Sequence, residues 1–255
     1  MRYIKSFQND AAIQAAVDNG SLGKPYVAYN ESAGTIDWNS KEEADYSKMY
    51  LTVEALGSGI LKLRRGTTYS LNEGEWTTVT MLADGVSMVS GDKVRVKATT
   101  GLTFYESTIV MKAYGNVMSA AYGDSFVGQT TIPSGFNGFK NMFDACSGLV
   151  DVSNLVIPAT GLTRGCYQAM FYDCTSLSTA PELPATTLVD YCYGEMFRGC
   201  SSLNYVKCLA TDIRYICTDR WLKDVSATGT FVKDANTTWP TGNDGIPSGW
   251  TVINA

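Results

Sequence analysis

Seven cysteines carry most of the chemistry that this sequence offers. They are Cys146, Cys166, Cys174, Cys192, Cys200, Cys208 and Cys217, all in the C-terminal half. A thiolate is a nucleophile and a zinc ligand, but the chain has no histidine to pair with one and no CxxC motif. The odd number, with no secretory signal, favours reduced thiols over a disulfide framework. We therefore interpret the cysteines as buried core thiols, with disulfides and a metal site as the alternatives.

Other kinds of catalytic site have little support in the residues. The absence of histidine removes the Ser-His-Asp arrangement and the commonest metal ligand. No GxxxxGK(S/T) or GxGxxG string is present to hold a phosphate. Glu42 and Glu43 lie in an apparent linker, where a solvated surface explains them, and only a glycosidase site built from distant carboxylates stays open. The sequence thus predicts a protein that is not an enzyme, with no catalytic, cofactor-binding or metal-binding residue.

The spacing of the cysteines marks the second half of the chain as a repeat. MFDACSGL at 142–149, MFYDCTSL at 170–177 and MFRGCSSL at 196–203 align without gaps, starting 28 and then 26 residues apart. A second block, in phase with the first, ends at Cys166 and Cys192, and in reduced form at Cys217. Such a period is typical of stacked repeats, because one unit cannot bury its own apolar face. The side chains predicted to line a shared interior are Met142, Phe143, Cys146, Leu149, Cys166, Met170, Phe171, Cys174, Leu177, Cys192, Met196, Phe197, Cys200, Leu203 and Cys217.

At these residues the sequence resembles the BspA-type leucine-rich repeat, whose pattern is close to MF-x-x-C-x-x-L followed by a segment with a proline. The resemblance covers about residues 132–217. It implies a right-handed solenoid with a parallel ladder of short strands, and a role in adhesion at a surface. A fold carries less information about function than about architecture.

The segment after the repeats contains Trp221, Trp239 and Trp250. The exposed end of a solenoid needs a cover, and large aromatic side chains can supply one. We therefore interpret residues 218–255 as a C-terminal cap, which resembles the tails ending in GIPSGW that follow such repeats. The alternative is an exposed aromatic platform that binds sugars.

Residues 46–114 alternate between apolar and polar side chains, as in YLTVEAL, GILKLRR, TTYSL, EWTTVTML, DKVRVKA and TIVMKAYG. Turn signals, among them Asp84-Gly85, separate these runs. The pattern predicts an antiparallel β-sandwich, immunoglobulin-like in outline, with Trp76 in its core or half-buried. Arg64-Arg65 is interpreted as a solvated turn, with an anion site as the less favoured alternative. The string at 115–126 is interpreted as a junction, rigid if Met118 and Tyr122 pack into the first repeat.

The first 45 residues predict a helix-plus-hairpin module. Asp10 can cap a helix over about 11–19, and the strand-like strings YVAYN and GTIDWNS follow it. So small a unit must dock on the sandwich, a sister subunit or another protein, and the side chains predicted to anchor it are Ile4, Phe7, Ile13 and Val17. One alternative is a generic hairpin and helix that only complete the sandwich. The string IKSFQNDAAIQAAVDNGSLGKPYVAYNESAGTIDWN resembles an N-terminal module of virion proteins from tailed phages that infect gut anaerobes. This resemblance implies head or tail fibres or capsid decorations, which leave the cell by lysis without a signal peptide.

The net charge and the hydropathy of the chain restrict the kinds of partner that we expect. The net charge is -5 and no basic stripe is present, so nucleic acid is not expected as a partner. No stretch is apolar enough to insert in a membrane. The expected fold is mixed and mainly β, with domains at 1–45, 46–114, 115–217 and 218–255. The resemblances imply a virion protein that contacts other virion proteins and a host-surface protein or glycan. A homo-oligomer is expected, because virion appendages are commonly symmetric. The alternative is a bacterial surface or secreted adhesin.

Overall fold

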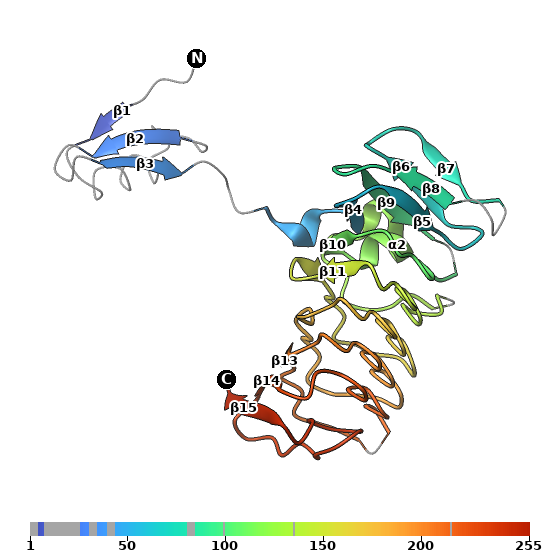
Figure 1. The fold of residues 1–255 in the computed structure, drawn as a ribbon, viewed down its shortest axis with the longest axis vertical. Helices are drawn as coiled ribbons and strands as arrows, with labels where there is room; N and C mark the ends of the chain where they lie inside the picture. The colour runs from blue at the N-terminus through green and yellow to red at the C-terminus, as the bar shows by residue number, and fades with distance from the viewer. Residues whose placement is uncertain are drawn as a thin grey trace. The chain divides into compact units, whose positions relative to one another are not determined.

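The protein is mainly β, with several sheets, none of them closed, and one short α-helix among the described residues. The computed structural model describes residues 5–7, 26–30, 35–39, 44–80, 85–98, 100–134, 136–214 and 216–255, and side chains from residue 44 onward. Contacts divide the chain into two compact units, Met1–Asp45 and Tyr46–Ala255. Each unit is described by itself (Figure 1).

The first unit contains one small sheet. Its strands are β1 (Lys5–Phe7), β2 (Tyr26–Asn30) and β3 (Thr35–Asn39). β2 and β3 pair antiparallel, so the two predicted strands form a hairpin, while β1 adds to β2 in parallel. The expected helix at 11–19 lies outside the described residues.

The second unit begins with antiparallel strands that follow the alternating runs of the sequence. A short 3-10 helix, η1 (Tyr46–Lys48), precedes them. The strands are β4 (Thr52–Ala55), β5 (Gly59–Lys62), β6 (Thr68–Leu71), β7 (Trp76–Thr78), β8 (Gly85–Met88), β9 (Lys93–Lys97) and β10 (Met111–Asn116). The main sheet has the order β10-β4-β9-β6-β7, and β5 pairs with β8 in a second sheet. Trp76 is 37% exposed rather than in the core.

One strand of this part was not expected. Gly85, interpreted as a turn residue, begins β8 and pairs with Lys62 across the two-stranded sheet. A Cβ on Gly85 would collide with the side chain of Ile60. The glycine therefore permits close strand pairing, which a sequence signal based on Asp-Gly cannot distinguish from a turn.

β10 joins this sheet to the repeats. On one side it pairs antiparallel with β4, and on the other side it pairs in parallel with β11 (Leu149–Asp151) and β12 (Leu155–Val156). The helix α2 (Met118–Tyr122) and the 3-10 helix η2 (Gly123–Ser125) follow β10. Met118 is fully buried, and the Tyr122 hydroxyl donates to the Thr131 carbonyl at 2.8 Å. Sheet and repeats thus belong to one hydrophobic core.

Successive repeats are connected through their backbones. The N–H groups of Phe139, Asn141, Phe143 and Ala145 donate to the carbonyl oxygens of Cys166, Gln168, Met170 and Tyr172 at 2.6–3.0 Å. The next pair of repeats bonds in the same way, as in Phe171 N–H to the Met196 carbonyl at 2.8 Å. The intervening N–H of Cys146 donates back to the Phe143 carbonyl. Alternate residues therefore bond within and between repeats, which satisfies the buried backbone without long strands.

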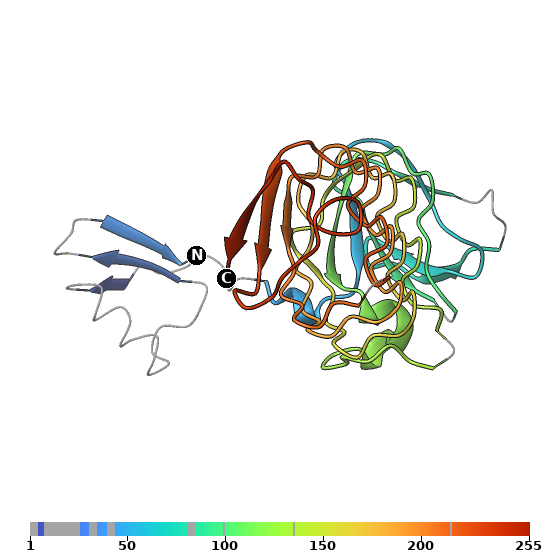
Figure 2. The same ribbon diagram turned by 90° about the horizontal axis from the view of Figure 1, so that it is seen from below.

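Aromatic rings stack along the same direction. One column consists of Phe104, Phe143, Phe171 and Phe197, with centroids 4.9, 5.5 and 5.4 Å apart and ring planes within 8° of parallel. A second column runs through Phe139, Tyr167, Tyr193, Trp221 and Trp239. The spacing is close to the separation of about 4.8 Å between neighbouring strands, so hydrogen bonding and ring stacking impose the same repeat. In Figure 2 the turns of chain coloured yellow to orange largely overlie one another.

A parallel sheet begins within the last part of the repeats and continues into the C-terminal segment. Its strands are β13 (Tyr205–Lys207), β14 (Gly229–Lys233) and β15 (Trp250–Asn254), the orange and red arrows of Figure 2. Trp221, Trp239 and Trp250 are 0%, 6% and 6% exposed. The indole N–H of Trp221 donates to the Gly245 carbonyl at 2.9 Å. Burial contradicts the idea of an exposed aromatic platform, because no ring face is left for a sugar.

The second ring column gives a test of packing. The Tyr167 hydroxyl is buried and has no hydrogen-bond partner among the described residues, and Phe139 holds the equivalent position one repeat earlier. Tyr167→Phe is therefore expected to raise the free energy of unfolding by about 1 kcal/mol, since it removes an unsatisfied polar group. Urea denaturation measures the change. Tyr122→Phe, which loses a hydrogen bond, is the control and should lower stability; a clear loss in Tyr167→Phe would reveal a partner for that hydroxyl.

Candidate functional site

The structure buries every side chain that the sequence assigned to the repeat interior. Met142, Phe143, Cys146, Leu149, Met170, Phe171, Cys174, Leu177, Cys192, Met196, Phe197, Cys200, Leu203 and Cys217 are 0% exposed, and Cys166 is 1% exposed. All seven cysteines are free and buried. They lie in the interior of the stack.

Three of the thiols act as hydrogen-bond donors between repeats. Cys146 donates to the Phe104 carbonyl at 2.9 Å, Cys174 to the Phe143 carbonyl at 3.0 Å, and Cys200 to the Phe171 carbonyl at 2.9 Å. Each thiol thus bonds to the preceding repeat, while the backbone N–H groups bond to the following one. This structural role explains the regular positions of these three cysteines.

Burial also holds these thiols in the protonated form. Desolvation raises the pKa of Cys146 to about 12, that of Cys166 to about 11 and that of Cys208 to about 12. The pKa of Cys174 is raised well above its ordinary value, first by desolvation and then by Cys200. A thiol is a weak nucleophile and a poor metal ligand until it ionises. Within the described residues no group of three or more acidic or cysteine side chains is placed to hold a metal ion.

The stack extends one unit further toward the N-terminus than the sequence analysis indicated. Phe104 begins the first ring column, and Ser107 lies three residues after it, as Cys146 lies three residues after Phe143. Ser107 is fully buried and its hydroxyl accepts a hydrogen bond from the Lys62 N–H at 3.0 Å. The sequence signal for this additional unit is the spacing F-x-x-S, which does not match the Met-Phe and Cys pattern of the later repeats.

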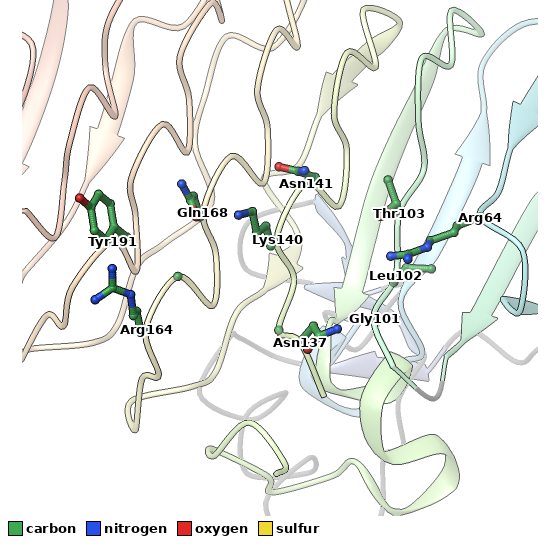
Figure 3. A pocket seen from close by; sticks show the side chains of 12 residues that line it. Arg64, Gly101, Leu102, Thr103, Asn137, Lys140, Asn141, Arg164, Gln168 and Tyr191 are labelled. Carbon is green, nitrogen blue, oxygen red and sulfur yellow. The ribbon is translucent and has the colours of Figure 1, made fainter. Parts of the chain in front are cut away.

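A groove with a basic lining lies on the outer surface of the same repeats. This basic groove has a volume of about 680 Å³ and is lined by Arg64, Gly101, Leu102, Thr103, Asn137, Gly138, Lys140, Asn141, Arg164, Gly165, Gln168 and Tyr191. Figure 3 shows its side chains in a row that crosses successive passes of the chain, from Arg64 to Tyr191. Arg164, Gly165 and Tyr191 belong to the second repeat block, but no single repeat contains the whole set, so only the stacking brings these residues together.

The charge of the basic groove is only partly compensated. Arg164 forms an ion pair with Asp190 at 3.4 Å, and its guanidinium lies 5.0 Å from the centre of the Tyr191 ring. Arg64 and Lys140 are exposed, and no described residue forms an ion pair with either of them. The interpretation of Arg64 as a solvated turn residue missed this groove, because the other residues of its lining lie 37 or more residues away in the sequence.

The backbone keeps the basic groove open at one position and closes it at the next. Gly165 and Tyr191 occupy equivalent positions in adjacent repeats, and both have left-handed backbones, with φ of 65° and 55°. Gly165 adds no side chain to the groove, whereas the Tyr191 side chain lies at the end of the row in Figure 3. The same turn geometry therefore gives an open floor or a wall, depending on the residue.

Carboxylates from neighbouring repeats also come together. Desolvation raises the pKa of Asp144, with Asp173 and then Glu106 contributing. None of these three lines the basic groove. Stacking of neighbouring repeats brings these carboxylates close together. It does not place an acid and a base on opposite sides of a cleft.

The predicted anchor residues are not placed. Ile4, Ile13 and Val17 lie outside the described residues, and Phe7 belongs to β1 with no described side chain. In the part of the chain that the structure describes, no helix has the length and apolar character needed to cross a membrane.

Comparison of the chain with protein-family models, with curated proteins and with solved structures finds no match.

Proposed function

We propose that this chain is a non-enzymatic structural and binding protein whose residues 115–217 form a short solenoid of the BspA leucine-rich-repeat type. The observation that carries the proposal is the uninterrupted column of rings and thiol hydrogen bonds that runs from Phe104 to Phe197. In this arrangement the cysteines of the repeat serve for packing, and polar side chains remain on the outside. Such a solenoid offers an extended surface to a partner.

In this proposal the flanking parts protect the two ends of the solenoid. Residues 46–114 act as an antiparallel sandwich, immunoglobulin-like in outline, and cover the first end through β10 and Phe104. Residues 218–255 cover the other end with Trp221 and Trp239, whose rings stack 5.3 Å apart. Capping of this kind is a general requirement of stacked repeats, since an open end exposes apolar surface.

The proposed setting is the virion of a tailed phage. Residues 1–45 would attach the chain to other virion proteins as part of a head fibre, a tail fibre or a capsid decoration, in an oligomer, and the solenoid would contact a host-surface protein or glycan. The support is the resemblance of the N-terminal string to virion modules, together with the separate compact unit that these residues form. The alternative is a bacterial surface adhesin, which the repeat resemblance also favours.

Mass spectrometry of gradient-purified virions tests the setting. We expect peptides of this chain in the particles, in amounts comparable to other structural proteins. Thiol titration of the particle-derived chain in denaturant without reductant should count seven free thiols, the number in the sequence. Absence from particles, together with a cell-surface chain that has oxidised cysteines, would overturn the virion proposal and support the adhesin.

A further inference from the structure

We propose that the basic groove binds an acidic glycan, a chain of sugars that carries carboxylate or sulfate groups. This inference rests on the proposed binding function and identifies where on the molecule the contact is made and with what chemistry. It uses the residues of the groove and no part of the first 45 residues.

The first argument is charge. The chain as a whole has 25 acidic and 20 basic residues, yet this groove gathers Arg64, Lys140 and Arg164 and has no acidic residue in its lining. Asp190 offsets Arg164 alone. Two exposed cations that pair with no acidic side chain among the described residues favour an anion from outside, because a groove lined by charge of one sign concentrates ions of the opposite sign. Guanidinium groups bind carboxylates and sulfates through paired hydrogen bonds.

The second argument is hydrogen bonding. Asn137, Asn141 and Gln168 line the groove between the cations, and none of their side-chain amides forms a hydrogen bond to another described residue. An amide group offers both donors and an acceptor, which suits the hydroxyl groups of a sugar better than it suits a simple anion. Cations that alternate with amides therefore match a ligand that alternates acidic groups with hydroxyls.

The third argument is shape. The groove crosses several passes of the chain and has a volume of about 680 Å³, within the range of roughly 300–1,000 Å³ for ligand sites. Leu102 is buried, so the floor offers little apolar surface. The Tyr191 ring is the aromatic group of the groove, and the Arg164 guanidinium already lies against it. Stacking of nucleic-acid bases needs exposed ring faces, which makes a nucleic acid the weaker fit.

Binding measured by calorimetry tests the proposal with the full chain. The probes are a heparin hexasaccharide for sulfated sugars, an oligogalacturonate for carboxylated sugars, a neutral dextran oligosaccharide, and an oligothymidylate as a polyanion without acidic sugars. We expect binding to at least one acidic saccharide, weakening as salt is raised, and none to dextran. The stronger of the two acidic probes identifies the anionic group.

Variants locate the site. Arg64→Ala combined with Lys140→Ala should weaken acidic-glycan binding about tenfold or more, because two charge-assisted contacts are lost. Arg65→Ala is the matched control, since Arg65 is exposed, adjacent in sequence and not part of the groove, and it should change affinity less than about twofold. The thermal unfolding curve of each variant should match that of the parent, because all three side chains are exposed.

Several results would overturn the groove assignment: no binding of either acidic saccharide, equal loss in Arg65→Ala, or oligothymidylate binding as tightly and with the same sensitivity to the variants. Binding of the labelled protein to host cells keeps this outcome separate from the proposed function. If cells bind the parent and the double variant equally, the display function stands and the groove assignment fails. If the chain is absent from particles and binds no cells, the proposed function fails.

Discussion

Raising the pH above about 9 is expected to destabilise this protein progressively, whereas stability should change little between about pH 7 and pH 9 on account of its thiols. The folded chain holds Cys146, Cys166 and Cys208 protonated, with pKa values raised from 9.0 to about 12, 11 and 12 by burial. The unfolded chain ionises these thiols at their ordinary pKa. Above that pH the unfolded state therefore releases protons that the folded state retains, and the equilibrium moves toward unfolding as the pH rises toward the folded pKa values.

The expected effect is large compared with the stability of a typical domain. Each such thiol lowers the free energy of unfolding by about 1.4 kcal/mol per pH unit above its unfolded pKa. The three thiols together would lower it by about 4 kcal/mol per unit, against a total of about 5–15 kcal/mol for most proteins. Burial raises the pKa of Cys174, Cys192 and Cys200 as well, which steepens the dependence.

Urea denaturation at a series of pH values, in the presence of reductant, measures this dependence. Thiolate absorbance in the ultraviolet, followed without urea, should stay low until the protein unfolds. Cys208→Ala is the matched variant. Its free energy of unfolding should fall less steeply with pH than that of the parent, by about 1.4 kcal/mol per pH unit, because it has one buried thiol fewer. Thiols that titrate near pH 9 in a protein that is still folded would contradict the burial on which the repeat stack depends.

Replacing Gly148 by serine is expected to lower the free energy of unfolding by about 3 kcal/mol, even though serine is the residue of the other repeats at this position. Ser176 and Ser202 are its equivalents, and both are exposed. Gly148 is buried where β10 pairs with β11, and its carbonyl accepts the Met111 N–H at 2.9 Å. A Cβ there would lie 2.6 Å from the Ile109 carbonyl carbon and from the Thr108 carbonyl oxygen, and closer still to the Ile109 oxygen.

The reason is that the colliding atoms are backbone atoms, which cannot move without separating the antiparallel sheet from the first repeat. Urea denaturation of Gly148→Ser against the parent measures the loss. Ser202→Gly is the control and should cost less than about 1 kcal/mol, the ordinary effect of added backbone freedom. A Gly148→Ser protein as stable as its parent would mean that the sheet and the first repeat do not approach as closely as described.

The buried cysteines and Gly148 show how much of the structure can be predicted from the sequence. The Met-Phe, Cys and Leu positions are regular because every repeat places them in the same environment, and the period alone selects the side chains that the structure buries. Positions that depart from the repeat pattern are harder to interpret from the sequence. Gly148 replaces serine where a strand of another part of the chain approaches, and Ser107 takes the position of a cysteine one unit before the recognisable repeats.

The antiparallel strands were predictable for the same reason as the repeat interior. Alternation of apolar and polar residues marks a strand with one buried face, and β4, β6 and β9 follow the runs that show it. β8 was missed because its first residue is a glycine, which serves equally well in a turn and in a tightly paired strand.

What the sequence determined by itself is the mainly β character, the period of the repeat and the identity of the side chains that the period brings into phase. These follow from local periodicity, which is written in the order of residues. Only the tertiary structure decided that β10 is shared between sheet and repeats, and that Arg64, Lys140 and Arg164 line one groove. Neighbours across a stack are one repeat or more apart along the chain, so their meeting depends on the register between layers and leaves no local pattern in the sequence.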